Sequence, residues 1–480
     1  MQPECADVAR SELHSRYAEK LVVNSDLDRT LVSFQANKEL PFYSWFKYKE
    51  GFAKPFVDYC INSFGDQGEL LDPFAGSGAA LFVAAERGMS ATGIELLPSA
   101  TFSIEARMAA LEVDPEKFRR YADRVLKADF ESMHDESTAI RHVKITEKAY
   151  SEETERDLSG YLYYVRNKLG PKAIKTLLEF AAFSVLEEIS FTRKDGQYLR
   201  WDQRAGKSEK TKFDKGEILS FRKAVEQKLS DMKNDLLNLT RDGNQKFLVD
   251  TKTKAGEIEL IQGTCLHKLR GLPSDRTDLV ITSPPYCNRL DYTRTYCLEL
   301  TFLGCSESKI KMLRQTMLSC TVENKSKVGV LRRYYRDKGD LESFELAKAA
   351  FESQEGFHEV WSYLDSLIGL KKPNGKKMLP NENVPRMIWN YFFEMNLVIQ
   401  QLARVLKPGG RVVMVNDNVQ YAGEELPVDL ILSDYAEAHG LEIETIWVLP
   451  RGKGNASQQM GKHGRTEIRK CVYVWKKSEV

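Results

Sequence analysis

The sequence is poor in the residues that build metal sites and disulfides. Its 480 residues include only 7 histidines and 8 cysteines. The cysteines are scattered without a CxxC pair, and no histidines have HExxH spacing, which disfavours structural zinc, a disulfide framework and a metallohydrolase. We therefore expect reduced thiols, no metal and a cytoplasmic protein.

Long apolar runs and a net charge are also lacking. No run of about 18 apolar residues occurs, so we expect no transmembrane helix and no contact with a membrane. The polar stretch that opens the chain has no apolar signal core. The net charge is only +1, from 70 Lys and Arg against 69 Asp and Glu. Bulk charge therefore neither supports nor excludes a nucleic-acid partner, and local patches must decide.

What the chain does contain is an α/β pattern around a turn of small residues. In GELLDPFAGSGAALFVAAERG, a strand ends at Leu70-Leu71, a turn runs from Asp72 to Gly78, and a helix follows from Ala79 to Arg87. A second strand, Ala91 to Ile94, ends in Glu95. This strand–turn–helix–strand unit predicts the opening of a doubly wound α/β sheet.

Further strands are expected much later in the chain. They run from Ile258 to Ile261, Leu279 to Thr282, Arg411 to Val415, Leu441 to Leu449 and Lys470 to Trp475, the last two as an antiparallel pair. A long apolar helix is expected from Arg386 to Leu406. Because neighbouring strands in such folds are joined by short loops and one helix, the long gaps indicate two insertions. We divide the chain into a cofactor-binding half (1–109), a helical and basic insertion (110–255), a catalytic half (256–304), a second insertion (305–380) and a C-terminal part (381–480).

The glycine turn is suited to binding a nucleoside. Gly76 and Gly78 allow a tight bend and close approach of a ligand, and the next helix directs its free N–H groups at the same spot. Glu95 stands where an acidic group commonly accepts hydrogen bonds from a ribose diol. A plain tight turn is the simpler alternative, and Glu95 favours the nucleoside.

A second corner follows the strand that ends at Thr282. Pro284 and Pro285 have no N–H, so they end the strand's hydrogen bonding and stiffen the backbone. Ser283 can accept or donate a hydrogen bond, the Pro284 carbonyl is expected to be free, and Tyr286 offers a ring on which a base can stack. These groups suit a planar ligand with an exocyclic amine. The alternative is a turn that merely ends a strand, but both corners should lie at the carboxyl edge of one sheet, where such folds bind ligands.

Together these motifs resemble those of the S-adenosylmethionine-dependent amino-group DNA methyltransferases. The segment FYSWFKYKEGFAKPFVDYC resembles the family's extra cofactor-contacting segment, and LARVLKPGGR resembles the segment before its fifth strand. The resemblance implies a Rossmann-like methyltransferase sheet with a mainly helical inserted target-recognition region, and S-adenosylmethionine as the cofactor. It implies cofactor contacts from Lys47, Asp72, Pro73, Phe74, Ala75, Gly76, Ser77, Gly78, Glu95 and Thr264, and catalytic roles for Ser283, Pro284, Pro285 and Tyr286.

The resemblance does not by itself decide the methylated base. A serine at the start of the proline corner is associated with N4 of cytosine in this family, and Asp or Asn with N6 of adenine. The order of the motifs, cofactor first with a large insertion between, is typical of a subgroup other than many cytosine-N4 enzymes. We therefore favour cytosine N4 and keep adenine N6 open, with a transfer-RNA guanosine amine and a non-catalytic regulator as more distant alternatives.

Two positions depart from what related chemistries need. The family often has an acidic residue after the third strand's glycine, whereas here Thr264 and Cys265 follow Gly263. A catalytic cysteine directly after proline would indicate methylation at cytosine C5, but Tyr286 separates Cys287 from the prolines. We expect Cys287 to be a packed thiol.

Basic stretches within the insertions are candidates for contact with double-stranded DNA. Residues 191–223 hold ten Lys and Arg against five Asp and Glu, with aromatics between them. Such a stretch suits phosphate contact and base readout, and a solvated loop is the alternative. We predict DNA contacts from Arg193, Lys194, Arg200, Arg332 and Arg333. The sequence leaves open whether a cognate restriction endonuclease or another defence component accompanies the protein.

Overall fold

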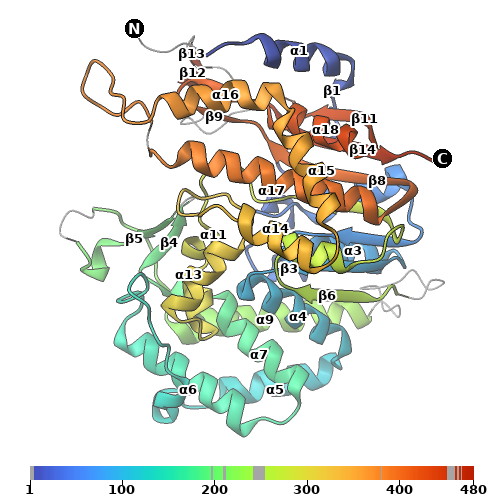
Figure 1. The fold of residues 1–480 in the computed structure, drawn as a ribbon. Helices are drawn as coiled ribbons and strands as arrows, with labels where there is room; N and C mark the ends of the chain where they lie inside the picture. The colour runs from blue at the N-terminus through green and yellow to red at the C-terminus, as the bar shows by residue number, and fades with distance from the viewer. Residues whose placement is uncertain are drawn as a thin grey trace.

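A single large sheet runs through the molecule (Figure 1). The computed structural model describes residues 5–195, 198–208, 212–241, 255–379, 381–450, 460–461, 464–465 and 468–479. Within them, eight strands are ordered β1, β11, β14, β8, β7, β2, β3 and β6. Their bounds, in that order, are Leu21–Val23, Leu441–Val448, Lys470–Lys477, Leu406–Asp417, Thr277–Thr282, Glu69–Asp72, Ser90–Glu95 and Ile258–Gln262.

The sheet is parallel in its central part and antiparallel at one side. Strands β8, β7, β2, β3 and β6 are parallel neighbours, whereas β14 is antiparallel to both β8 and β11. The predicted doubly wound α/β sheet and its closing antiparallel pair are confirmed. The short edge strand β1, which pairs with β11, was not predicted, because three residues carry no readable period.

Alternate residues of the central strands feed two separate hydrophobic cores. Leu279 and Ile281 of β7 pack on one face of the sheet, and Val280 between them packs on the other. The first face is covered by α2 (Lys54–Phe64), α3 (Ala79–Glu86) and α4 (Pro98–Glu112). The second face is covered by α1 (Val8–Tyr17), α10 (Cys265–Lys268), α14 (Val328–Asp337), α15 (Leu341–Glu352), α16 (Glu355–Ser366), α17 (Val384–Val405) and α18 (Val428–Ala438).

The predicted helix before β8 is present as α17, but the strand begins earlier than expected. It starts at Leu406 rather than at Arg411. Leu406 pairs with Thr277 of β7, and a register shift follows before Leu279 pairs with Arg411. The Pro408–Gly410 stretch is therefore part of an irregular strand, in which Gly409 has a φ of 79°.

The described part of 110–255 is mainly helical and shares the first core. Its helices are α5 (Pro115–Leu126), α6 (Glu152–Lys168), α7 (Lys172–Ser184), α8 (Leu186–Ile189) and α9 (Phe221–Arg241). Phe183 of α7 packs edge-on against Phe102 of α4, with ring centroids 5.1 Å apart. The insertion is thus packed against the cofactor half rather than held on a linker, and its role in target recognition stays a prediction.

Several smaller elements lie outside the sheet and its covering helices. A hairpin of β4 (Thr192–Asp195) and β5 (Tyr198–Trp201) projects from the insertion (Figure 1). The remaining α-helices and strands of the described residues are α11 (Tyr292–Thr295), α12 (Cys297–Phe302), α13 (Glu307–Thr316), β9 (Val419–Tyr421), β10 (Glu424–Leu426), β12 (Met460–Gly461) and β13 (Gly464–Arg465). Among the described helices, none is both long enough and apolar enough to cross a bilayer.

Candidate active site

The glycine turn and the proline corner line one pocket at the carboxyl edge of the sheet. The turn contributes Asp72 to Ser77, the end of β3 contributes Ile94 and Glu95, and the corner contributes Ser283 and Pro285. The pocket holds about 740 Å³ of empty space, open solvent included. The two motifs meet because β2 and β7 are parallel neighbours, with Leu70 opposite Leu279.

The glycine turn has the tight bend that its sequence predicts. Gly76 and Gly78 both have positive φ, at 54° and 85°. A Cβ on Gly76 would lie 2.9 Å from the Tyr48 ring, and one on Gly78 would lie 2.9 Å from Ile104. Both positions therefore need glycine for conformation and for space. Gly78 precedes α3 and does not itself line the pocket.

Glu95 organises the turn as well as lining the pocket. Its carboxylate accepts hydrogen bonds from the backbone N–H groups of Gly76 (2.8 Å), Leu96 (2.8 Å) and Leu97 (2.7 Å). Burial raises the pKa of Glu95 to about 7, against the opposing effect of these three donors. A carboxylate has about four acceptor sites, so one stays available for a hydroxyl of a bound ligand.

Asp72 connects the two motifs directly. The Thr282 hydroxyl, which precedes the proline corner, donates to the Asp72 carboxylate at 2.7 Å, and the Phe74 N–H donates to the same oxygen at 3.0 Å. Burial raises the pKa of Asp72 to about 7. A side chain at the end of β2 therefore fixes the end of β7, one residue before Ser283.

The proline corner contributes Ser283 and Pro285 to the pocket lining, whereas Pro284 is buried and lies outside that lining. Ser283 is half-buried and lines the pocket. Within the described part of the chain no hydrogen bond to the Pro284 carbonyl is present. Tyr286 is half-buried beside the pocket rather than in its lining, and burial raises the pKa of its hydroxyl, so the phenol is neutral.

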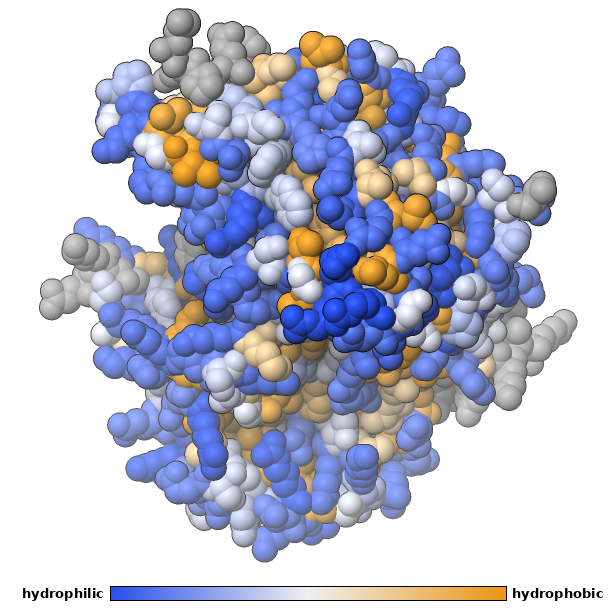
Figure 2. Space-filling model, in the orientation of Figure 1, coloured by the Kyte–Doolittle hydropathy of each residue, from blue (hydrophilic) through white to orange (hydrophobic). Residues whose placement is uncertain are grey.

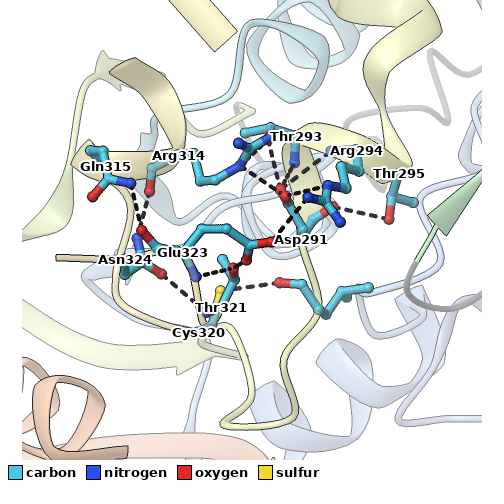
Figure 3. Close-up of polar contacts among 11 residues, drawn as sticks. Asp291, Thr293, Arg294, Thr295, Arg314, Gln315, Cys320, Thr321, Glu323 and Asn324 are labelled. Atoms are coloured by element: carbon cyan, nitrogen blue, oxygen red, sulfur yellow. Dashed lines mark hydrogen bonds and ion pairs between the residues drawn. The ribbon is translucent and has the colours of Figure 1, made fainter. Parts of the chain in front are cut away.

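A polar network holds the chain that follows the corner (Figure 3). Asp291 is buried, accepts from the N–H of Thr293 at 3.0 Å and forms an ion pair with Arg314 at 2.8 Å. Asn324 donates to the Arg314 carbonyl at 2.7 Å, and the Cys320 thiol lies 3.4 Å from the Leu290 carbonyl. These contacts join the corner to residues 314–324 of the second insertion, which also bring Met317 and Leu318 into the pocket lining.

An aromatic wall closes the pocket on the side of the segment resembling the family's extra cofactor-contacting region. Tyr48 lies on Gly76 and stacks on Tyr296, with ring centroids 5.1 Å apart at 15°. The Tyr296 hydroxyl donates to the Glu50 carboxylate, and Glu50 and Tyr292 both line the pocket. Burial raises the pKa of Glu50.

The structure places Lys47 outside the pocket, although the sequence predicted that it contacts the cofactor. It does not line this pocket; it is exposed and lies by a separate depression near Lys194. From this segment, Tyr48, Glu50, Gly51 and Phe52 line the pocket. A resemblance over 19 residues finds the segment but not which side chains turn inward.

Arg107 is another site-forming residue that sequence reasoning missed. It is 1% exposed on α4 and donates to the carbonyls of Ser77 (2.7 Å), Phe42 (3.1 Å) and Tyr43 (3.3 Å). Burial lowers its pKa to about 10, which leaves it charged at neutral pH. It ties the glycine turn to the segment before Tyr48, and the local sequence, in which Glu105 stands two residues before it, gives no sign of this role.

The electrostatics of the pocket fit a cationic ligand. Three carboxylates line it, from Glu50, Asp72 and Glu95, and no lysine, arginine or histidine among the described residues does so. A pyrophosphate-bearing dinucleotide would meet only like charge here, whereas a sulfonium and an ammonium would be attracted. Thr264 and Cys265 stand at the edge where the family often has an acid, and both line the pocket.

The predicted DNA-contacting residues do not form one cluster. Arg193 and Arg200 lie opposite each other on the β4–β5 hairpin and are exposed. Arg332 and Arg333 are exposed on α14, which lies over the second core and away from that hairpin (Figure 1). Arg332 is also paired with Glu345 at 2.8 Å.

Lys194 was also predicted to contact DNA, but the structure buries it. Its side chain and that of its ion-pair partner Glu299 are each 2% exposed, so it cannot reach a phosphate. The ammonium also lies 4.5 Å from the centroid of the Tyr296 ring. Side chains alternate along a strand, so Lys194 points inward where Arg193 points out.

Cys287 and the possible metal ligands are two further features of the described residues. Cys287 is fully buried, and burial raises the pKa of its thiol, as expected for a packed residue. No group of three or more His, Cys, Asp or Glu able to hold a metal occurs in the described part of the chain.

This fold, in which a glycine turn and the Ser283 and Pro285 side chains of a Ser-Pro-Pro-Tyr corner line one pocket, is that of an amino-group DNA methyltransferase. Comparison with known proteins makes the family explicit: the chain belongs to the type II methyltransferases. It is 43% identical over 469 residues to the type II methyltransferases M.AvaI of Nostoc sp. and of Anabaena variabilis, covering 97% of this chain and 92% of each relative. It is 38% identical over 487 residues to M.BsoBI of Geobacillus stearothermophilus, covering 98% and 92%. No family model matches the sequence. The protein is therefore a site-specific DNA methyltransferase.

Proposed function

We propose that the protein transfers a methyl group from S-adenosylmethionine to N4 of a cytosine flipped out of double-stranded DNA. The observation that carries the proposal is the shared pocket, in which Ser283 faces the same space as the glycine turn and the three carboxylates. The turn would hold the cofactor and the corner would hold the base.

The residues present fit S-adenosylmethionine. Glu95 would accept from the ribose, the turn from Asp72 to Ser77 would enclose the methionine part, and the apolar side chains of Phe74, Ile94 and Leu96 would contact the adenine. When bound, the cofactor supplies a methyl group already activated by a sulfonium. The chain's own contribution is then binding and orientation.

The corner would orient the target amine. The Ser283 hydroxyl and the Pro284 carbonyl would each accept a hydrogen bond from one N–H of the amine. These two bonds favour a pyramidal nitrogen whose lone pair is directed into the pocket. The target nitrogen would gain the methyl group as the sulfur–methyl bond breaks and leaves a neutral thioether, and it would lose one proton to solvent. Cys287 takes no part, because no covalent bond to the ring is needed.

The base must leave the duplex to reach this corner, because the amine is otherwise enclosed in a base pair. Tyr286 beside the corner and Tyr292 in the pocket lining would replace the stacking that the base loses. Stacking on an aromatic side chain contributes about 1–3 kcal/mol per base.

Adenine N6 is the second candidate, favoured by one observation. The glycine turn precedes the proline corner with a large insertion between them, an order typical of a subgroup other than many cytosine-N4 enzymes. The serine at the corner favours cytosine.

The direct test is to incubate the protein with labelled S-adenosylmethionine and mixed-sequence duplex DNA and to identify the modified nucleoside by mass spectrometry. We expect N4-methylcytosine. Detection of N6-methyladenine would overturn the choice of base, and DNA that stays unlabelled after incubation would overturn the proposed function.

Ser283→Ala tests the role of the corner. We expect methylation to fall at least about 100-fold, the scale of losing an oriented polar contact to a reacting group, while the Kd for the cofactor changes less than about threefold. Cys287→Ala is the matched control and should retain activity. Turnover by Ser283→Ala at the wild-type rate would refute the assignment.

A further inference from the structure

A short hairpin projects from the second insertion between α16 and α17. Residues 370–378 form it around the turn Pro373-Asn374-Gly375. The Gly375 N–H donates to the Lys372 carbonyl at 2.9 Å, and Gly375 has a φ of 78°. Proline in the first turn position followed by a glycine of positive φ is a stable three-residue connection, so the tip is an ordered element.

The two arms of this hairpin, which are joined by an isolated β-bridge, place like charges opposite each other. Lys371 pairs with Lys377 across the hairpin, and the Lys372 N–H donates to the Lys376 carbonyl at 2.7 Å. All four lysines are exposed. Like charges directly opposite one another destabilise a pair of strands, so this arrangement is unfavourable in the free protein.

Few carboxylates of the described residues neutralise these lysines. In the described part, Lys377 is paired with Glu382 at 2.9 Å, with both side chains largely in solvent, and the other three have no carboxylate partner. Exposed pairs of this kind contribute at most about 1 kcal/mol. The hairpin therefore carries a concentrated positive charge on a molecule whose formal net charge is only +1.

The hairpin and the β4–β5 hairpin are placed so that both can contact one ligand. It projects on the same side of the molecule as the β4–β5 hairpin (Figure 1). Figure 2 shows a hollow between the two projections. The β4–β5 hairpin also places two cations opposite each other, Arg193 and Arg200, of which Arg200 is paired with Asp195 at 3.5 Å. It also contacts α11, whose first residue, Tyr292, lines the pocket.

We propose that residues 370–378, which we name the lysine hairpin, grip the phosphate backbone of duplex DNA from the side of the hollow opposite β4–β5. The inference rests on the proposed function and adds a specific second arm to it. A regular polyanion relieves the repulsion within both like-charged pairs, and two basic arms facing one hollow suit a duplex lying between them. Lysine acts as a point charge here, so the grip holds DNA of any sequence.

The test is a full-length variant with Lys371→Gln, Lys372→Gln, Lys376→Gln and Lys377→Gln. We expect its Kd for a mixed-sequence duplex at about 0.1 M salt to rise at least tenfold. The slope of log K against log salt should become shallower by about one unit for each phosphate that the hairpin no longer neutralises. The Kd for S-adenosylmethionine should stay within twofold, since the hairpin does not line the pocket.

The matched control removes the same charge from the region of α5, α6 and α7, at the end of the molecule away from the hollow (Figure 1). Its substitutions are Lys117→Gln, Lys127→Gln, Lys168→Gln and Lys172→Gln, all at exposed positions. We expect this variant to bind DNA within twofold of wild type.

The outcomes separate the two proposals. If wild type methylates DNA and the lysine-hairpin variant keeps both affinity and salt slope, the hairpin inference is wrong and the enzyme assignment stands. An equal loss in the control variant would also overturn the hairpin, because it would show only the effect of net charge. If wild type methylates no DNA, the proposed function itself fails.

Discussion

Lys194 and Arg193 show how neighbouring residues of one basic stretch come to have different roles. Arg193 is exposed on the outer side of β4, whereas Lys194 is enclosed with Glu299 beneath the aromatic wall. The Lys194 carbonyl also accepts from the Lys49 ammonium, one residue after Tyr48. Lys194 therefore belongs to the support of the pocket, through Tyr296 and Tyr48.

Lys194→Met should lower the stability of the protein rather than its affinity for DNA. It leaves the buried Glu299 carboxylate without its cation, and breaking a buried pair in this way costs about 3–5 kcal/mol. Thermal or urea unfolding measures this loss. Adding Glu299→Leu should recover much of it, because no buried charge is then left unpaired.

Arg193→Met is the control for that experiment, since it removes a cation from the same strand at an exposed position. We expect its free energy of unfolding to lie within about 0.5 kcal/mol of the wild-type value. A Lys194→Met protein of normal stability that binds DNA poorly would contradict the structural role.

At the scale of elements, the β4–β5 hairpin is the part of the first insertion best placed to touch DNA. Its exposed arginines face each other across the strands, Arg200 also stacks on Phe213 with its guanidinium 4.2 Å from the ring centroid, and the hairpin borders the hollow. The stacking restricts Arg200, which lowers the entropy lost when it binds.

Arg193→Glu combined with Arg200→Glu should weaken DNA binding at least about tenfold at 0.1 M salt and flatten its salt dependence. Fluorescence anisotropy over a salt series measures both quantities. Arg332→Glu combined with Arg333→Glu on α14 is the matched comparison, and we expect a change below about threefold because α14 lies away from the hollow. Equal losses in the two variants would place α14 on the path of the DNA as well.

Elements with a clear pattern of apolar residues could be predicted from the sequence. Elements whose position depends on residues far along the chain could not. The helix α17 and the strands β2, β3 and β7 follow from local runs of apolar residues with clear ends. The paired arms of β4 and β5 carry mixed polar residues without a readable alternation, so the sequence indicated only a basic stretch.

The same division holds for the candidate site. Ser283 and Glu95 end strands and could be placed from the sequence alone, because the carboxyl ends of parallel strands share one edge. Tyr48 and Met317 reach the pocket through packing and polar contacts with residues far along the chain, such as the ring stacking with Tyr296. No local pattern reports such contacts.

At the scale of the whole molecule, one sheet has both faces covered and carries the pocket at its carboxyl edge. The first insertion thickens one face and sends the β4–β5 hairpin past the edge, and the second insertion adds helices to the other face and sends out the lysine hairpin (Figure 1). Both insertions thus contribute to the core and to the surroundings of the hollow. We expect deletions of either to unfold the enzyme rather than to yield a methyltransferase without DNA specificity.

The electrostatics of the pocket predict how cofactor binding depends on pH. Burial raises the pKa of both Asp72 and Glu95 to about 7 in the ligand-free protein, so below pH 7 both are largely neutral. A cationic cofactor binds the ionised carboxylates more tightly, so binding lowers their pKa values and releases protons. By linkage, affinity must rise with pH through this range. We expect the Kd for S-adenosylmethionine to be several-fold higher at pH 6 than at pH 7.5, since each group that must ionise changes affinity by up to about tenfold per pH unit.

Isothermal titration calorimetry in buffers of different ionisation enthalpy measures both the Kd and the protons released. Asp72→Asn provides the comparison, because its amide oxygen can still accept from Phe74 and Thr282 while one titrating group is removed. This variant should bind more weakly at pH 7.5, release fewer protons and show a shallower pH dependence. A wild-type Kd that is constant from pH 6 to 7.5, without proton release, would mean that these carboxylates do not respond to the cofactor's charge.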